Sequence, residues 1–210
     1  MSHPARFVFA GDSITDCDRD RSDPASLGEG YVRLVADALA GGAAGEGGVR
    51  DADVRNAGVS GDRAVDLENR WATDVVALRP DVLTVYVGVN DTWRRFDSDD
   101  PTSAETFEAT LLRLVAALPA PRPRLLFIEP FLLPVRAEQE GWLEDLAGKR
   151  AAVARVAAGS GATFVPLQER LTAAAVVDGP AAIAPDGVHP SPAGQAIIAA
   201  AWLEAFGAAS

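Results

Sequence analysis

The stretch Leu83-Thr84-Val85-Tyr86-Val87 is almost continuously apolar, and it ends at Gly88. A strand with one wet face alternates apolar and polar side chains, whereas an unbroken apolar run is typical of a strand buried on both faces. Such strands occur in parallel sheets that carry helices on both sides. This stretch therefore predicts a parallel sheet inside an α/β domain.

The rest of the chain supports this prediction, because strand and helix patterns alternate along it. With residues 82–87, further apolar runs at 6–10, 54–57, 125–129 and 163–165 predict five strands. Between and after them, apolar residues recur with the spacing of one helix face. These faces begin at Tyr31, Leu67, Phe107, Trp142 and Pro192. We expect one domain over residues 1–210, with a five-stranded parallel sheet covered on both faces.

Several residues predict where helices begin and end. Thr102 and Glu105 have the spacing of a capping box at the start of the third helix. Ser191 and Pro192 are typical of an N-cap and a first helical position, and Gly207 is typical of a terminator. Lys149, the only lysine of the chain, lies on the predicted polar surface of the fourth helix.

The composition excludes several classes of function. Lys and Arg number 19 against 30 Asp and Glu, a net charge of −11, which disfavours binding to nucleic acid or to an anionic membrane. The single cysteine, Cys17, excludes an internal disulfide, and the two histidines, His3 and His189, exclude a multi-histidine zinc site. We expect no metal and no cofactor. Neither a signal peptide pattern nor an apolar run of membrane-spanning length is present, so we expect a cytoplasmic protein.

Polar and glycine-containing segments follow the predicted strands. They are Gly11-Asp12-Ser13-Ile14-Thr15-Asp16, Asn56-Ala57-Gly58-Val59-Ser60-Gly61-Asp62, Gly88-Val89-Asn90-Asp91 and, near the C-terminus, Asp186-Gly187-Val188-His189-Pro190. Each segment alone is typical of a turn or a helix cap. Ligands of open parallel sheets bind outside the carboxyl ends of the strands. All four segments are expected at these carboxyl ends, and their occurrence together favours a functional site.

The residue types in these segments match the needs of ester hydrolysis. That reaction uses a nucleophile, a base, a group that orients the base, and donors for the oxyanion. Ser13 is the candidate nucleophile, and His189 is the candidate base because His3 lies near the chain end. Asp186, three residues before His189, can reach its second ring nitrogen. Asn90 can donate a side-chain N–H to the oxyanion, and Ser13 and Gly61 can donate backbone N–H groups.

These four segments, in this order, resemble those of the SGNH (GDSL-type) hydrolases. The resemblance extends from Gly11 to His189. It implies a flavodoxin-like three-layer α/β/α sandwich and a Ser13–His189–Asp186 triad, with Ser13, Gly61 and Asn90 as oxyanion donors. The sequence alone does not separate Gly58 from Gly61 as the glycine donor; we favour Gly61 because it closes the block of the family.

A narrower likeness joins the chain to intracellular acetylxylan esterases. It is carried by the run from Gly11 to Cys17, by Asn69-Arg70-Trp71 with Asp74-Val75, and by Asn90-Asp91-Thr92-Trp93-Arg94. It implies an esterase that removes acetyl groups from xylo-oligosaccharides and forms a homo-oligomer. We expect Asp12 and Trp93 to contact the substrate, Trp93 as a stacking platform for sugar or as a wall of the acyl pocket. The alternative for Trp93 is a hydrophobic plug beneath its loop. Trp202 and Phe206 can belong to an interface or to the core.

Other functions fit less well. Thr15 stands where the nucleophile elbow of an α/β-hydrolase needs glycine, and no aspartate lies two positions from Asp12 as an aspartyl phosphatase requires. No carboxylate pair is singled out for a glycosidase. A non-catalytic carbohydrate-binding protein is disfavoured by the complete set of catalytic residue types. Thioesterase, lysophospholipase and acyltransferase activities use the same chemistry and stay open.

Overall fold

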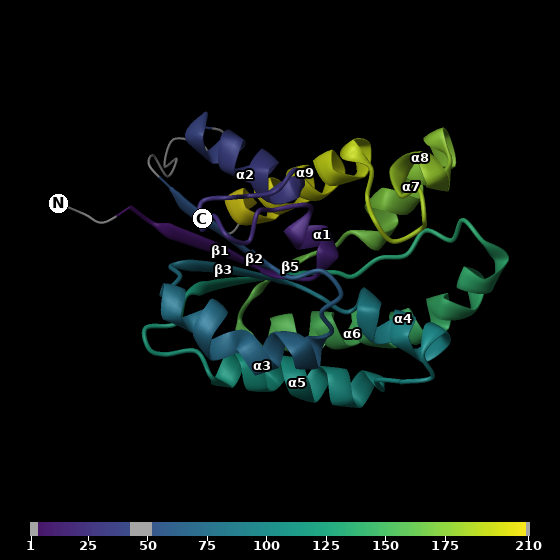
Figure 1. The fold of residues 1–210 in the computed structure, drawn as a ribbon, viewed down its shortest axis with the longest axis horizontal. Helices are drawn as coiled ribbons and strands as arrows, with labels where there is room; N and C mark the ends of the chain where they lie inside the picture. The colour runs from purple at the N-terminus through teal and green to yellow at the C-terminus, as the bar shows by residue number, and fades with distance from the viewer. Residues whose placement is uncertain (1–3, 43–51, 209–210) are drawn as a thin grey trace.

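The computed structural model describes residues 4–42 and 52–208 and contains a five-stranded sheet in the order β2-β1-β3-β4-β5 (Figure 1). Every neighbouring pair of strands is parallel. The strands are β1 (Arg6–Gly11), β2 (Asp53–Gly58), β3 (Val82–Tyr86), β4 (Arg124–Ile128) and β5 (Thr163–Val165). The predicted parallel α/β sheet is therefore confirmed, and each strand end lies within one residue of the predicted one.

Helices cover both faces of this sheet, so the domain has three layers (Figure 1). One face carries α1 (Ser13–Asp16), α2 (Tyr31–Ala40), α7 (Gln168–Asp178), α8 (Pro180–Ile183) and α9 (Pro192–Ala208). The other carries α3 (Ala64–Asp74), α4 (Val89–Asp97), α5 (Ala104–Ala116) and α6 (Trp142–Ser160), with the short 3-10 turns η1 (Val76–Leu78) and η2 (Ala137–Gly141).

The two faces of β1 show how the strands build two core layers. Phe7 and Phe9 pack into the core on the α2 and α9 side, whereas Val8 and Ala10 pack against the α3, α5 and α6 side. Successive side chains of a strand point to opposite faces, so a strand with apolar residues at every position binds two helix layers at once.

The C-terminal aromatic residues belong to the first of these layers. Trp202 is fully buried and stacks on Phe206 with ring centroids 4.9 Å apart, and both rings contact Phe7. The indole N–H of Trp202 donates to the hydroxyl of Thr84 at 2.8 Å, which provides a partner for the polar residue of the apolar β3 run. Trp202 and Phe206 are therefore core residues in this chain, and the interface alternative is wrong.

Three local predictions are corrected. Helix α5 begins at Ala104, because the Ser103 hydroxyl, and not Thr102, accepts the N–H of Thr106 at 3.1 Å. Helix α9 continues through Gly207 to Ala208. Lys149 is 1 % exposed instead of lying on the surface, because it forms an ion pair with Asp145 one helical turn earlier.

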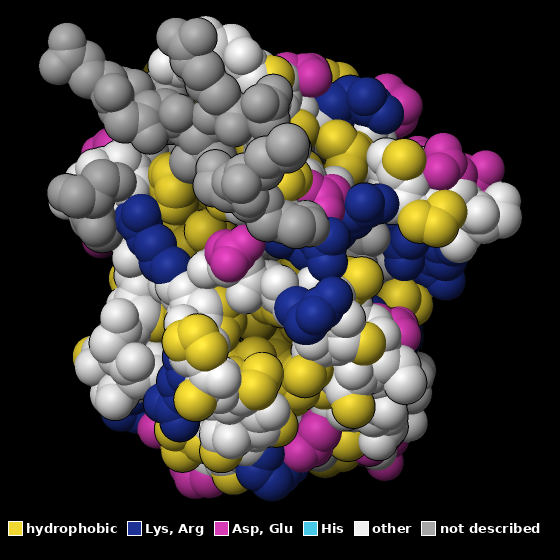
Figure 2. Space-filling view, turned by 90° about the vertical axis from the view of Figure 1, so that its left-hand side faces the viewer, with side chains coloured by type: hydrophobic (Ala, Val, Ile, Leu, Met, Phe, Trp, Pro, Cys, Tyr) yellow, Lys and Arg dark blue, Asp and Glu magenta, His cyan; other side chains and the backbone are white. Residues whose placement is uncertain are grey.

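The strand order decides where a site can form. The chain passes from β1 outward to β2, crosses back over β1 to β3, and then continues to β4 and β5. Ligand sites of such sheets lie at the carboxyl ends of the strands between which the chain direction reverses, here β1 and β3. Figure 2 views the opposite end of the molecule, where the strands begin and where apolar and arginine side chains surround a shallow hollow.

Candidate active site

Ser13 lies directly beyond the carboxyl end of β1, as the first residue of α1. Asp12 caps this short helix, and its carboxyl oxygen accepts the N–H of Ile14 at 3.0 Å. The turn requires glycine at position 11, because a Cβ there would lie 2.3 Å from the carbonyl oxygen of Tyr86 on β3. The close packing of β1 on β3 thus fixes the point at which Ser13 leaves the sheet.

A chain of hydrogen bonds joins Ser13 to the segment before α9. The Ser13 Oγ lies 2.9 Å from Nε2 of His189, and Nδ1 of His189 lies 2.6 Å from Oδ2 of Asp186. An ionised carboxylate can only accept hydrogen bonds, so the proton of the neutral imidazole sits on Nδ1. Nε2 is then free to accept the proton of the Ser13 hydroxyl.

Asp186 is held as a carboxylate by its surroundings. Its Oδ1 accepts the backbone N–H groups of Val188 at 2.9 Å and His189 at 2.7 Å. Burial alone would raise the pKa of Asp186, but the hydrogen bonds from the His189 ring and from these two N–H groups outweigh it and hold that pKa below its ordinary value. Asp186 is therefore ionised at neutral pH and accepts hydrogen bonds as a carboxylate.

The loop after β2 has an unusual set of backbone hydrogen bonds. The N–H groups of Gly58, Val59, Ser60 and Asp62 all donate within the described structure. Their acceptors are Asn56 Oδ1 (2.9 Å), the Gly11 carbonyl (3.0 Å), Asp16 Oδ2 (2.9 Å) and the Val59 carbonyl (3.2 Å). The N–H of Gly61 has no acceptor among the described residues, and the same holds for the N–H of Ser13. Both N–H groups are free to bind a ligand.

Gly58 and Gly61 have different structural roles. A Cβ on Gly58 would lie 2.3 Å from the backbone nitrogen of Asp16, so this glycine allows α1 to pack on the loop. Gly61 has a φ of +89°, and nothing lies within 4 Å of an added Cβ. Glycine is therefore favoured at position 61 by the left-handed backbone conformation and not by lack of space. Because the Gly58 N–H is already bonded, only Gly61 can offer a backbone donor from this pair.

Asn90 lies beyond the carboxyl end of β3, in the first turn of α4. Its Nδ2 donates one hydrogen to the carbonyl of Asp62 at 3.0 Å, and its second amide hydrogen has no acceptor among the described residues. The next residue, Asp91, accepts the N–H of Ala64 at 3.0 Å and so ties the start of α4 to the start of α3. Burial raises the pKa of Asp91 to about 7.

Asp12, which we expected to contact the substrate, is buried at the start of α1. The residue is 1 % exposed and its carboxyl group points into the domain, toward Ile14. Burial, and then the nearby carboxyls of Asp91 and Asp62, raise its pKa to about 7 despite the hydrogen bond from Ile14. Asp12 caps the turn that carries Ser13, and its contact with substrate stays a prediction.

Trp93 lies beside the histidine. Its ring centroid is 6.1 Å from that of His189 and 5.5 Å from that of the buried Trp142, and Trp93 itself is half-buried. Its side chain therefore both packs on the core and borders the site. Cys17 is half-buried one turn after Ser13, where burial raises the pKa of its thiol and disfavours the reactive thiolate.

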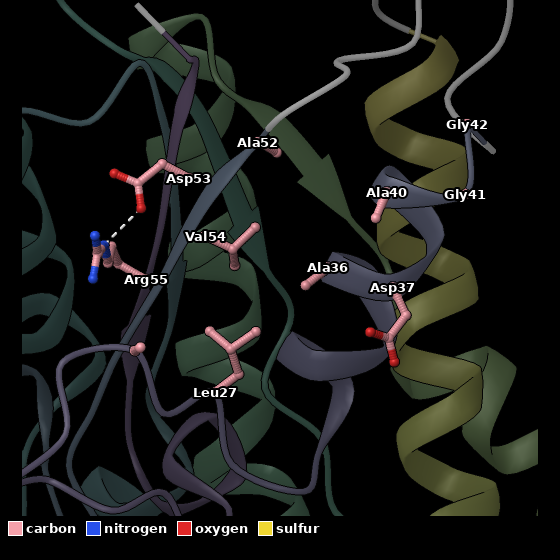
Figure 3. A pocket seen from close by; sticks show the side chains of 11 residues that line it. Leu27, Ala36, Asp37, Ala40, Gly41, Gly42, Ala52, Asp53, Val54 and Arg55 are labelled. Carbon is pink, nitrogen blue, oxygen red and sulfur yellow. Dashed lines mark ion pairs between the residues drawn. The ribbon is translucent and has the colours of Figure 1, made fainter.

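A hollow of about 330 Å³ opens next to Ser13 and His189. Its other lining residues include the polar Asp18, Ser60 and Gln195. A larger hollow of about 670 Å³ lies between β2 and α2 (Figure 3), but its lining is mostly small and apolar, and the Asp53–Arg55 ion pair of 2.7 Å lies on the other side of β2 from Val54. The smaller hollow is lined by Ser13 and His189, whereas the larger one is not.

Several residues that shape this site were not singled out for a role in the sequence analysis. Asp16 accepts both the N–H and the hydroxyl of Ser60, and Arg70 pairs with Asp62. Only the position of Arg70, beside Trp71 on a helix that packs on the sheet, could have suggested a buried charge. Within the described residues, no group of three or more His, Cys, Asp or Glu side chains is arranged to hold a metal ion, and no helix has the length and hydropathy needed to cross a bilayer.

Comparisons with known proteins agree with one another. The sequence model of the GDSL-like lipase/acylhydrolase family matches residues 9–197. An acetylxylan esterase of Geobacillus stearothermophilus is 34 % identical, over 96 % of this chain and 94 % of its own. The crystal structure of that species' esterase Axe2 superimposes with a TM-score of 0.87 at 32 % identity, over 97 % of this chain and 94 % of the other.

Two further sets of structures are similar. A protein of Parabacteroides merdae described as a GDSL-like lipase has a TM-score of 0.89 at 32 % identity, over 97 % of this chain and 96 % of its own. Catalytic mutants of Axe2, in which a serine, an aspartate or a histidine is replaced by alanine, superimpose with TM-scores of 0.87 to 0.88.

Proposed function

Because this chain belongs to the GDSL-like lipase/acylhydrolase family and is a serine esterase, we propose that Ser13, His189 and Asp186 form its catalytic triad. The observation that carries the proposal is the pair of contacts Ser13 Oγ–His189 Nε2 (2.9 Å) and His189 Nδ1–Asp186 Oδ2 (2.6 Å). The Axe2 mutants add support, since the aspartate and histidine replaced there are three positions apart, as Asp186 and His189 are.

In the proposed mechanism, His189 moves the protons. Nε2 takes the proton of Ser13 while Oγ attacks the ester carbonyl carbon, and it then gives this proton to the departing alcohol oxygen. The C–O bond to the alcohol breaks and leaves an acyl group on Ser13. Water, deprotonated by the same nitrogen, releases the acyl group as a carboxylic acid, and Ser13 regains its proton. Asp186 orients the ring and stabilises its cationic form.

The oxyanion donors are the N–H groups of Ser13 and Gly61 and the free amide hydrogen of Asn90. Each is available for a ligand while the groups beside it are already bonded. Donors fixed before the reaction stabilise the charge that develops on the carbonyl oxygen without reorganising at the moment of reaction. No step of this scheme needs a metal or a cofactor, so dialysis against EDTA should leave kcat unchanged.

We propose short acyl esters of carbohydrates, acetyl esters above all, as the substrates. The similar esterase of Geobacillus stearothermophilus acts on acetylxylan. In this chain the rings of Trp93 and His189 lie 6.1 Å apart, so Trp93 narrows the space on one flank of the base. The hollow with Asp18, Ser60 and Gln195 lies on another flank and offers hydrogen-bond partners to sugar hydroxyls.

The test of the reaction is hydrolysis of 4-nitrophenyl acetate by the wild type and by S13A. We expect S13A to lose activity by a factor of about 10⁴ or more, because the nucleophile acts as a unit with its base. Its Tm should stay within about 2 °C of the wild type, since the Ser13 side chain is not part of the core. Near-normal turnover by S13A would overturn the triad.

The test of the substrate compares acyl chains and alcohols separately. Acetyl, butyryl and octanoyl esters of 4-nitrophenol measure the acyl side, and a preference for octanoyl would contradict the short-acyl proposal. Acetate release from acetylated xylo-oligosaccharides, beside other acetylated sugars, measures the alcohol side. W93A should shift the acyl preference toward butyryl; an unchanged ratio would assign Trp93 to packing alone.

We also infer assembly of this chain into a homo-oligomer. Val176 and Val177 of α7 are each 81 % exposed, and an apolar hollow that includes Leu132, Leu143 and Val176 lies beside them. Sedimentation of the wild type against V176D/V177D tests this inference. A monomeric wild type would contradict it.

A further inference from the structure

Arg70 makes an unusual set of contacts for a residue outside the triad. Its side chain is 15 % exposed, and its guanidinium donates to three separate segments of the chain. Nη2 donates to the carbonyl of Gly11 at 3.1 Å, Nη1 to the carbonyl of Ala57 at 2.8 Å, and Nε to Oδ2 of Asp62 at 2.6 Å. A planar fork of donors is suited to such a set of acceptors, whereas a lysine ammonium is not.

Each acceptor belongs to a segment that carries an oxyanion donor. Gly11 ends β1 two residues before Ser13, and its carbonyl also accepts the N–H of Val59 at 3.0 Å. Asp62 directly follows Gly61. The backbone carbonyl of Asp62 in turn accepts the amide of Asn90 at 3.0 Å, so Arg70 reaches the third donor through one intermediate residue.

The charges of Arg70 and Asp62 stabilise each other. Burial raises the pKa of Asp62, and Arg70 acts against that rise by hydrogen bond and charge. Removing the guanidinium would take its donor from the partly buried carboxyl group of Asp62 and one donor from the Ala57 carbonyl, which is costly. The Gly11 carbonyl would keep the N–H of Val59. The loop that holds Gly61 would then relax toward other partners.

We propose that Arg70 is a positioning residue for the oxyanion hole, acting with Asp62 to fix the Gly61 N–H and the Asn90 amide relative to Ser13. This inference rests on the proposed function, because it assumes that these three groups receive the oxyanion. A residue of this kind stabilises the transition state through other groups. Its loss therefore lowers kcat and leaves KM for a small ester nearly unchanged.

A matched control separates this role from general stabilisation. Arg150 on α6 also forms a partly buried ion pair, with Glu129 at 2.9 Å, at the far side of the sheet order beside β4 and β5. Glu129 keeps two backbone donors, Leu167 and Gln168, when Arg150 is removed. R150M should lower the Tm but leave kcat within about twofold of the wild type.

The experiment measures kcat, KM and Tm with 4-nitrophenyl acetate for wild type, R70M, R70K, R150M, N90A and R70M/N90A. We expect R70M to lower kcat about 10- to 100-fold with KM within about threefold, and R70K to recover part of the loss. In the N90A background, R70M should cost only about threefold, because one of the donors that Arg70 positions is already gone.

Two results would overturn the proposal. One is a kcat of R70M within threefold of the wild type beside a Tm loss like that of R150M. The other is an equal R70M effect with and without Asn90. If R70M does not fold, R70K decides alone: a loss of kcat below about threefold at unchanged KM contradicts the proposal. S13A reports on the proposed function independently, since retained activity there would refute the triad whatever Arg70 does.

Discussion

The proposed acid–base pair, His189 and Asp186, and the proposed oxyanion donors are held beside Ser13 by different kinds of contact. The side chains of His189 and Asp186 are 46 % and 41 % exposed. Among the described residues, the carboxyl group of Asp186 accepts hydrogen bonds only from Val188 and His189, and its backbone carbonyl accepts Nε2 of Gln139 at 2.7 Å. On the oxyanion flank, Asp62 and Arg70 are mostly buried and connect three elements of the fold.

Activity and stability are therefore coupled on the oxyanion flank and largely separate on the acid–base flank. The acid–base flank is a local structure, in which a carboxylate three residues before a histidine closes a small ring of hydrogen bonds. The oxyanion flank is a tertiary structure that forms only when β1, β2 and β3 are in register. Changes on the first flank should affect chemistry alone, and changes on the second should affect both chemistry and folding.

The largest effect that tests this contrast is expected from D186N. Asn keeps an oxygen for the N–H groups of Val188 and His189, but its amide donates to Nδ1 and forces the imidazole proton onto Nε2, where it blocks proton transfer from Ser13. We expect kcat to fall about 10³- to 10⁴-fold, as for the equivalent change in other triads. The Tm should move by no more than about 2 °C, measured by calorimetry. A large loss of Tm would contradict the local character of this flank.

A smaller loss of activity is expected from N90A, together with a loss of stability. Removing one oxyanion donor should lower kcat about 10²- to 10³-fold. The carbonyl of Asp62 also loses the amide that donates to it at 3.0 Å, which should cost about 1 kcal/mol in the free energy of unfolding. Steady-state kinetics and urea denaturation of the same preparation measure both. If N90A keeps wild-type stability, the two flanks are held alike and the comparison fails.

The smallest effect on activity is expected from D12N. This variant should instead change how the free energy of unfolding depends on pH. Since the pKa of Asp12 is about 7 in the folded protein, against 3.8 ordinarily, the unfolded chain releases this proton first as the pH rises. The contribution of Asp12 therefore becomes unfavourable between about pH 4 and 7. From pH 5 to 8, wild type should lose about 2–3 kcal/mol more stability than D12N.

The acid–base flank has the opposite pH dependence. The lowered pKa of Asp186 gives a contribution that is present above its ordinary value and is lost as the pH falls. The control for D12N is D178N, at the exposed end of α7. Equal pH slopes for wild type and D12N, by urea denaturation at pH 5 and 8, would show that the carboxyl of Asp12 is not perturbed by burial.

The sequence predicted the parts of this molecule that are set by local pattern. The apolar run before Gly88 indicated a doubly covered parallel strand, and β3 is buried at every position. The strand-end segments indicated which residues would meet, because carboxyl ends of parallel strands share one edge. The spacing of Asp186 and His189 was enough to predict their contact, since it needs only one turn of chain.

The rest depended on contacts between distant residues. Gly58 and Gly61 are the same residue type, and the sequence cannot show that the Gly58 N–H is bonded to Asn56 while the Gly61 N–H has no acceptor among the described residues. Lys149 was expected on the surface because a helix pattern cannot show that an aspartate four residues earlier is buried with it. The contacts of Arg70 join positions 11, 57 and 62, and no periodicity along the chain encodes such a set.

Covalent trapping tests whether Ser13 is the nucleophile that His189 activates. A fluorophosphonate ester should add one phosphonyl group to the wild-type chain, and peptide mapping by mass spectrometry should place it on Ser13. Labelling of H189A should be slower by at least about 10³-fold, because the hydroxyl then has no base. A label on another serine, such as Ser60 or Ser160, or equal labelling of H189A, would contradict the account.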